Sequence, residues 1–178
     1  MVHIIEHIRL FAREAGKPEL SSVQVNKVVH SCLDMLGAQF RSRGIQLDCD
    51  LEGALPHVSA NPFSLEEVIL NLLNNALDAL EERLESDPTP PRVLISTELE
   101  EGTESRVKIK VADNGMGIPE DILARIFDPF FTTKDPDKGT GLGLAISRSI
   151  VEDSGGTLQI QTTRGKSTTF IISVPVEI

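Results

Sequence analysis

The sequence predicts an α+β fold of two layers, in which a mixed, mostly antiparallel sheet of five strands is covered on one face by three helices. After residue 20, five segments alternate polar and apolar residues with the period of a strand. Three further segments repeat apolar residues every three or four positions, as amphipathic helices do. Two pairs of strands follow each other across short turns, an order that favours antiparallel pairing.

The composition narrows the classes of function. With 178 residues, 40% of them hydrophobic and 25% charged, the chain is long enough for one domain with its own core. Its formal net charge of −10 opposes binding to nucleic acid, so we expect no nucleic-acid partner. Cys32 and Cys49 form no Cys-X-X-Cys pair and have no histidine array nearby, which argues against a zinc site or a disulfide framework.

The sequence contains no candidate membrane segment, because no apolar run approaches the roughly 20 residues that a membrane helix needs. The first residues also lack the basic start and apolar centre of a signal peptide. We therefore expect a cytoplasmic location, either for the chain as it stands or as the cytoplasmic part of a longer, membrane-attached protein.

Four segments have the apolar spacing of helices, one of them before residue 20. The first covers residues 2–15 and is stopped by Gly16-Lys17-Pro18, and a second runs from residue 25 to about 40. Asn61-Pro62 is a good helix start, because Asn caps free N–H groups and Pro suits the first helical position, and this helix extends to about residue 85. The last covers residues 142–153 and is closed by glycine.

The strands follow from alternation. Ile45, Leu47, Cys49 and Leu51 alternate with polar residues, which predicts a strand with one buried face and places Cys49 inward as a packing residue. The other predicted strands are two pairs, each joined by a short turn or loop: 93–97 with 107–111, and 157–163 with 167–174.

The helix from residue 62 carries two stripes. Its apolar stripe is predicted to face the core and consists of Leu65, Ile69, Leu72, Ala76 and Leu80. Its polar stripe falls within a narrow sector, because steps of three and four residues return to the same side of a helix. That stripe consists of Glu67, Asn71, Asn75, Asp78 and Glu82. Such a stripe is most often a solvated face.

Two glycine clusters, at residues 113–117 and 139–143, lie on either side of a Pro-rich segment that contains three prolines. Glycine lets a ligand approach the main chain closely, so the clusters indicate a phosphate site, although two ordinary turns would give the same pattern. A P-loop or a dinucleotide site does not fit, because neither cluster ends in Gly-Lys-Ser/Thr and no strand leads directly into the second.

Residues from about 60 to 176 resemble the ATP-binding catalytic domain of sensor histidine kinases, in the superfamily that includes DNA gyrase, mismatch-repair proteins and a heat-shock chaperone. Four motifs occur in the family's order and together are highly specific. Asn71-Leu-Leu-Asn-Asn75 resembles the N box, Asp113-Asn-Gly-Met-Gly117 the first glycine box, Phe127-Asp-Pro-Phe-Phe-Thr-Thr-Lys134 the F box, and Gly139-Thr-Gly-Leu-Gly143 the second glycine box. The resemblance implies a Bergerat-type fold and is strongest to the nitrogen-regulation-like branch.

The resemblance implies ATP or ADP as ligand together with Mg²⁺. Asp113 is expected to accept a hydrogen bond from the adenine amine, and Thr168 to lie near the base. Asn75 is expected to hold Mg²⁺, which oxygen ligands suit. Gly115 and Gly117 are expected to let the backbone approach the base. Further residues expected to contribute to nucleotide binding are Asp78, Ile118 and Phe127.

The phosphates are expected at the second glycine box, because free N–H groups at the start of a helix attract anions. The backbone expected to bind them comprises Gly139, Thr140, Gly141, Leu142, Gly143 and Leu144. Lys134 and Lys138 are expected to add positive charge, with residues 130–137 forming a mobile lid between the two glycine boxes.

Two residues depart from the family's pattern. Asp78 stands where many of these kinases have a basic residue, which puts more weight on the lysines. Asn71 stands where the ATP-hydrolysing relatives have a Glu that acts as general base, and an amide cannot accept a proton in that way. We therefore expect Asn71 and Lys134 to serve phosphotransfer rather than hydrolysis.

A histidine kinase also needs a phosphoacceptor histidine followed by an acidic residue, and none of His3, His7, His30 and His57 is followed by one. We therefore expect residues 1–20 to be a remnant of the second helix of the dimerisation and phosphoacceptor hairpin, and residues 21–178 to be the catalytic ATP-binding domain. The implied partners are that hairpin and the receiver domain of a response regulator. A non-catalytic nucleotide-binding module and an anti-sigma-type serine kinase are the alternatives.

Overall fold

A computed structural model describes residues 19–84, 89–134 and 139–177. The helix predicted for residues 2–15, Lys138 and part of the predicted lid lie outside the described residues. None of the helices in the described part of the chain has the length and apolar character that crossing a membrane requires.

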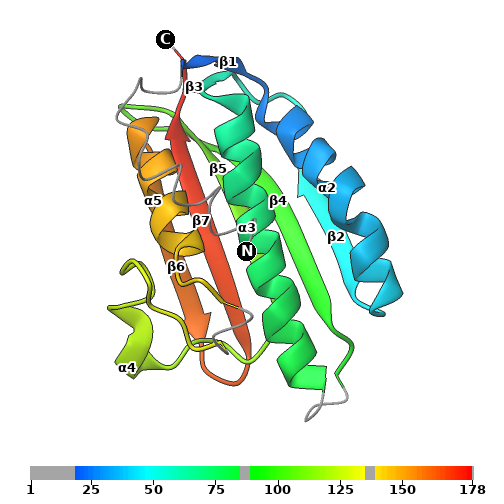
Figure 1. The fold of residues 1–178 in the computed structure, drawn as a ribbon. Coiled ribbons are helices and arrows are strands. Elements are labelled where there is room, and N and C mark those ends of the chain that lie inside the picture. The colour runs from blue at the N-terminus through cyan, green and yellow to red at the C-terminus, as the bar shows by residue number, and fades with distance from the viewer. Residues whose placement is uncertain (1–18, 85–88, 135–138, 178) are drawn as a thin grey trace.

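The predicted two-layer α+β fold is confirmed (Figure 1). The five-stranded sheet has the order β2-β4-β5-β7-β6, in which β2 is parallel to β4 and the other neighbours are antiparallel. Helices α2, α3 and α5 lie on one face of it. The elements are β1 (Ser21–Val23), α2 (Val25–Ser42), β2 (Gln46–Leu51), β3 (Val58–Ala60), α3 (Pro62–Leu84), β4 (Arg92–Glu100), β5 (Arg106–Asp113), α4 (Glu120–Leu123), α5 (Gly143–Asp153), β6 (Thr157–Thr163) and β7 (Ser167–Pro175).

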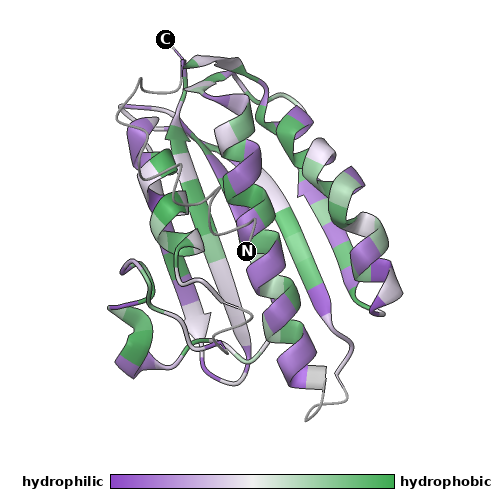
Figure 2. Ribbon diagram, viewed as in Figure 1, coloured by the Kyte–Doolittle hydropathy of each residue, from purple (hydrophilic) through white to green (hydrophobic). Residues whose placement is uncertain are grey.

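Helix α3 is the central helix of the covering layer, and its start is the one the sequence predicts. The Asn61 side chain accepts a hydrogen bond from the Ser64 N–H at 3.0 Å, which satisfies one of the free donors of the first turn. All five residues of the predicted apolar stripe are buried against the sheet. Figure 2 shows the matching hydrophobic residues along the middle of β4 and β7, where the helices cover them.

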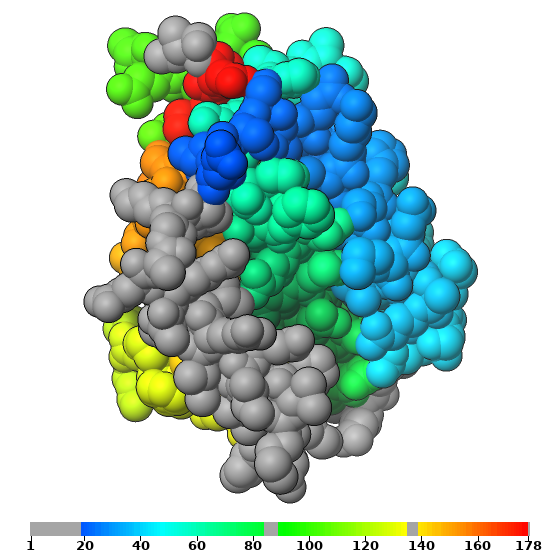
Figure 3. Space-filling view, turned by 45° about the horizontal axis from the view of Figure 1, so that its top comes forward, coloured from blue at the N-terminus to red at the C-terminus, as the bar shows by residue number. Residues whose placement is uncertain are grey.

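Two features of the fold escaped prediction. Strands β1 and β3 form a separate two-stranded sheet, which lies beside the first turn of α3 (Figure 1). Figure 3 shows the dark blue residues of β1 against the blue-green residues at the start of α3. Strands β1 and β3 have three residues each, too few for alternation to be visible. The short helix α4 has four residues and, like them, gives no periodic signal.

The prediction that Cys49 packs in the core is wrong, because its side chain is exposed. The register pairs Cys49 with the buried Ile95, so it does point to the helix-covered side of the sheet. β2 is an edge strand, however, and its side chains are at most half-buried, Cys49 among the exposed ones. Alternation predicted the direction of the side chain correctly but not the width of the covering layer.

Candidate functional site

Asp113 and Thr168 lie side by side at one end of the sheet. Asp113 is the last residue of β5, and the register of β5 with β7 places Thr168 directly opposite it. Both side chains are buried, with 5% and 4% of their surface exposed. The Thr168 hydroxyl lies 3.4 Å from that of Thr162 on β6. The structure therefore brings together the two side chains that the sequence assigns to adenine.

Burial raises the pKa of the Asp113 carboxyl to about 6. Hydrogen bonds from the backbone N–H groups of Gly115 and Thr168, and the positive charge of Arg83, act in the opposite direction. The bond from Gly115 measures 2.8 Å to Oδ1. Near neutral pH this buried group is therefore ionised and acts as a hydrogen-bond acceptor, which is what an amino group on a ligand requires.

The first glycine box packs against the protein's own atoms. A Cβ at Gly115 would lie 2.7 Å from Asp113 Oδ1 and 3.0 Å from the Ala79 Cβ on α3. Gly117 has a φ of +66°, and a Cβ there would lie 2.3 Å from the Thr163 carbonyl oxygen. These glycines are needed so that the loop after β5 can fit between α3 and the turn that joins β6 to β7.

Asn71 connects α3 to α5. Its side-chain Nδ2 donates a hydrogen bond of 2.9 Å to the hydroxyl of Ser147, which is 2% exposed. A Cβ at Gly143 would lie 2.4 Å from Asn71 Oδ1, so the amide sits directly against the first residue of α5. Asn71 thus fixes the position of the helix start that is predicted to bind phosphate.

Lys134 reaches the polar stripe of α3 from the end of the F box. Its Nζ lies 3.3 Å from Asn75 Oδ1 and forms an ion pair with the Asp78 carboxylate. Asn75 is half-buried, whereas Asp78 is exposed at the same side of the helix. The N box and the F box, separated by more than fifty residues, therefore meet through one lysine.

The second glycine box lies against the F box. The Phe130 N–H donates to the Gly141 carbonyl at 2.8 Å, and Gly141 has a φ of +68°. A Cβ at Gly141 would lie 2.4 Å from the Phe130 carbonyl carbon, and a Cβ at Gly139 would lie 2.5 Å from Thr132 Oγ1. Phe130 itself has a φ of +67°, a strained value for a residue with a side chain. The two segments therefore hold each other in one arrangement.

Residues 60–178 match the family described as histidine kinase-, DNA gyrase B- and HSP90-like ATPase. The chain belongs to this ATPase family. The sensor histidine kinase ZraS of Escherichia coli K12 is 40% identical over 159 residues, which make up 89% of this chain and 32% of that protein. The chain thus spans about a third of the length of the curated relatives it matches.

Solved histidine kinases share the fold. A nucleotide-free catalytic domain of the histidine kinase ThkA superposes with a TM-score of 0.73 at 28% identity, covering 89% of this chain and 98% of that one. Full-length ShkA in complex with AMPPNP gives a TM-score of 0.83 at 25% identity, covering 99% of this chain and 36% of that one. The family match and the curated relatives establish membership of the ATPase family, and the solved structures establish the fold.

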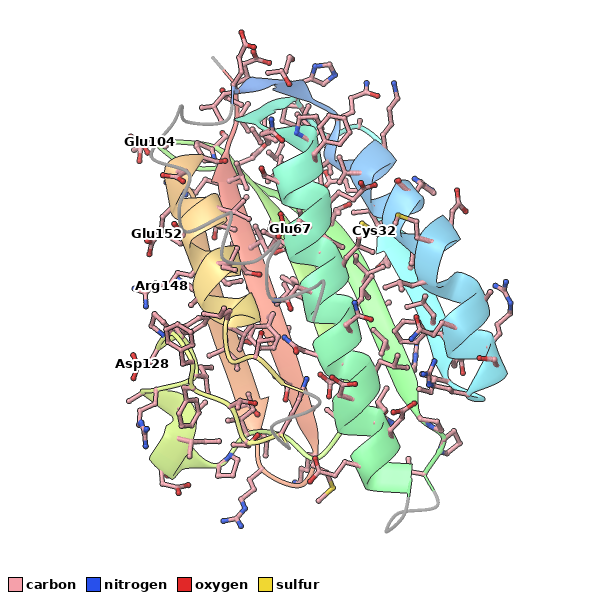
Figure 4. The ribbon with its side chains drawn as sticks, in the orientation of Figure 1. Cys32, Glu67, Glu104, Asp128, Arg148 and Glu152 are labelled. Atoms are coloured by element: carbon pink, nitrogen blue, oxygen red, sulfur yellow. The ribbon has the colours of Figure 1, made fainter. Side chains whose placement is uncertain are left out.

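The remaining residues that the sequence assigns to the ATPase site lie between these motifs. The Ile118 N–H donates to Thr162 Oγ1 at 2.9 Å, which ties the end of the first glycine box to β6. Phe127 is half-buried, and the Arg148 guanidinium lies 5.5 Å from the centre of its ring. Figure 4 shows Arg148 on the outer side of α5, away from α3. Within the second glycine box, the Leu142 N–H donates to Thr140 Oγ1 at 3.4 Å, and Leu144 is half-buried.

The side chains around Asn75 suit the hard cation that the ATPase family implies. Asn75 and Asp78 present amide and carboxylate oxygens, which Mg²⁺ prefers, and the ammonium of Lys134 already lies against them. The described residues contain no cluster of three or more His, Cys, Asp or Glu that would enclose a metal. An ion here would therefore take most of its ligands from nucleotide and water.

Sequence reasoning missed Arg83 and Ser147. Arg83 is 7% exposed and continues the buried stripe, since it stands three residues after Leu80, so the spacing alone could have found it. Ser147 lies on the buried face of α5, and its contact with Asn71 depends on the packing of two helices that are distant in sequence. No local pattern signals that contact.

Proposed function

We propose that the chain is the ATP-binding catalytic domain of a two-component sensor histidine kinase. It binds Mg-ATP and donates the γ-phosphoryl group to a histidine on a dimerisation and phosphoacceptor hairpin, from which the phosphoryl group passes to the receiver domain of a response regulator. The proposal assigns residues 21–178 to this domain and residues 1–20 to the end of the hairpin's second helix.

One observation carries the proposal. The four motifs come together: Asp113 and Thr168 lie beside each other, Lys134 reaches Asn75, and Asn71 lies against the start of α5. A convergence of this kind is not expected of unrelated turns and a solvated helix face. The AMPPNP bound to full-length ShkA supports a nucleotide at this site.

Each group has a distinct task in the proposed reaction. Asp113 accepts the hydrogen bond of the adenine amine, and a charged acceptor of this kind contributes about 1.5–3 kcal/mol. The free N–H groups at the start of α5 bind phosphate oxygens, helped by the positive end of the helix dipole. Asn75 would hold Mg²⁺, which when bound would supply positive charge to offset that of the phosphates.

Asn71 favours transfer over hydrolysis. Its amide cannot accept a proton from water, and its Nδ2 is already engaged with Ser147. The residue therefore positions the phosphate-binding helix without activating a water molecule. This separates the proposed kinase from the hydrolysing members of the superfamily.

The reaction is tested by supplying a hairpin domain in trans with ATP labelled on the γ-phosphate. The proposal expects an acid-labile, base-stable label on the hairpin's histidine, abolished by Asp113→Ala and strongly reduced by Asn75→Ala. Nucleotide binding without labelled histidine, using hairpins of several sensor kinases, would instead support a non-catalytic module. An acid-stable label on serine would indicate the anti-sigma type.

Calorimetry isolates the binding step. Asp113→Ala is expected to abolish binding of ADP, whereas Asn75→Ala is expected to lose the Mg²⁺-dependent part of the affinity and to keep metal-free binding. If Asp113→Ala bound ADP as tightly as the parent, the placement of adenine would be wrong.

A further inference from the structure

The ammonium of Lys134 lies where a cation is expected. Its Nζ is 3.3 Å from Asn75 Oδ1, the oxygen proposed to hold Mg²⁺, and the Asp78 carboxylate one turn further along α3 forms an ion pair with it. The chain thus places one of its own cations against the metal ligand. It does so with an acidic residue at position 78, where a basic side chain would repel the lysine.

Mg²⁺ and the Lys134 ammonium repel each other if both contact the Asn75 oxygen. Mg²⁺ binds oxygen at about 2.1 Å. With Lys134 Nζ 3.3 Å from the same atom, two positive charges would lie within roughly 5 Å of each other, a separation at which like charges repel appreciably. A metal at Asn75 therefore requires the ammonium to move.

The base of the Lys134 side chain is packed against backbone, whereas its ammonium is held by side-chain contacts with Asn75 and Asp78. A Cβ at Gly139 would lie 2.9 Å from the Lys134 Cβ, so this part of the chain is packed against the second glycine box. The Lys134 side chain as a whole is 36% exposed, so solvent reaches it. An ammonium that leaves Asn75 consequently stays close to the predicted phosphate position.

We propose that Lys134 is a built-in counter-cation, positioned by Asp78, that occupies the metal position at Asn75 until Mg-nucleotide displaces it. The inference rests on the proposed function and deepens it, because it assigns a role to the pair formed by Lys134 and Asp78. In the absence of metal the ammonium supports the nucleotide phosphates itself. Mg²⁺ then adds less affinity than it would at a site without the lysine.

The test measures the dissociation constant for ADP by calorimetry, once with EDTA and once with excess Mg²⁺, in the parent and in Lys134→Met. The dissociation constant in EDTA divided by the dissociation constant in Mg²⁺ gives the factor by which Mg²⁺ strengthens binding, and this is the ratio compared between variants. We expect Lys134→Met to weaken metal-free binding by about tenfold, as the loss of a charged hydrogen bond does, and to weaken Mg-bound binding less, so that the ratio rises. An unchanged ratio overturns the inference.

Lys110→Met is the matched control. Lys110 pairs with Glu98 between β4 and β5 and has a side chain of similar exposure (32%). It points away from the helices, because its neighbours Ile109 and Val111 are buried beneath them and successive side chains of a strand face opposite sides. Lys110→Met removes the same charge from the protein as Lys134→Met and is expected to leave the ratio at the parent's value. A rise equal to that of Lys134→Met would show a general effect of charge and would also overturn the inference.

The role of Asp78 is tested in both backgrounds. Asp78→Asn is expected to raise the ratio in the parent, because the lysine loses its anchor, and to leave it unchanged in Lys134→Met. A fall in the ratio in the double variant would mean that Asp78 binds the metal directly, which overturns its positioning role. Each ratio is taken within one variant, so a partial loss of folded protein cancels. Failure of the parent to bind ADP in either buffer would overturn the proposed function instead.

Discussion

Replacing Asp113 by Asn is expected to change the stability of the nucleotide-free protein in a pH-dependent way. The folded protein raises the pKa of this carboxyl from 3.8 to about 6, chiefly by burial. Below pH 4 the group is protonated in both the folded and the unfolded chain and imposes no penalty. Between pH 4 and 6 it ionises in the unfolded chain first, so the folded state loses stability as pH rises, and above pH 6 the full penalty applies.

The magnitude follows from the two pKa values. A tenfold change in a protonation equilibrium is worth about 1.4 kcal/mol, so a rise from 3.8 to about 6 corresponds to about 3 kcal/mol. An Asn at this position never ionises and escapes that penalty. It keeps an acceptor for the Gly115 N–H, but its new amino group needs a partner, an offset of about 1–3 kcal/mol that does not depend on pH.

Thermal unfolding of both proteins at pH 3 and pH 7.5 measures the pH-dependent part alone. With about 2–4 °C per kcal/mol for a chain of this size, the Tm of Asp113→Asn relative to the parent should rise by about 6–12 °C between the two pH values. A difference in Tm that is the same at both pH values would refute the reasoning. Asp48→Asn serves as control, because Asp48 is a half-buried carboxylate whose pKa is lowered, not raised, by hydrogen bonds from Gln46 and Arg92.

Three further outcomes are expected. Gly141→Ala should weaken nucleotide binding by at least tenfold in calorimetry, because a side chain there must adopt a φ of +68° against the F-box backbone; equal affinity would contradict the role of this turn. Asn71→Ala should lower the free energy of unfolding by about 1 kcal/mol in urea, through loss of its bond to Ser147, and Ser147→Ala should give a non-additive double variant. In the folded protein a thiol reagent should modify Cys49 rapidly and Cys32 slowly, since burial raises the pKa of Cys32 to about 12; rapid reaction of both would contradict the described core.

Most of the fold was accessible from local patterns. Alternation located the five strands of the main sheet, and the spacing of apolar residues located the three helices that cover it. The same rules failed for β1, β3 and α4, because three or four residues are too few to establish a period. They also failed for Cys49, because direction along a strand does not reveal how far a helix extends over the sheet edge.

The candidate site divides in a similar way. The resemblance to the kinase family assigned Asp113, Asn75 and Lys134 to adenine, metal and phosphate, and their residue types suit those ligands. The contact between Lys134 and Asp78 joins residues 56 positions apart and depends on how the F box folds back onto α3. No spacing rule contains that information, and the sequence showed only that an acidic residue stood in an unusual place.

The pairing of β7 with β5 sets an order for assembly of the site. Thr168 is supplied by the last strand of the sheet, and it meets Asp113 across more than fifty intervening residues. Loops of this length close slowly compared with local hairpins and helices. During synthesis, β7 must therefore leave the ribosome before the adenine end of the site can form. A chain arrested before β7 would expose the unpaired edge of β5 in place of a nucleotide site.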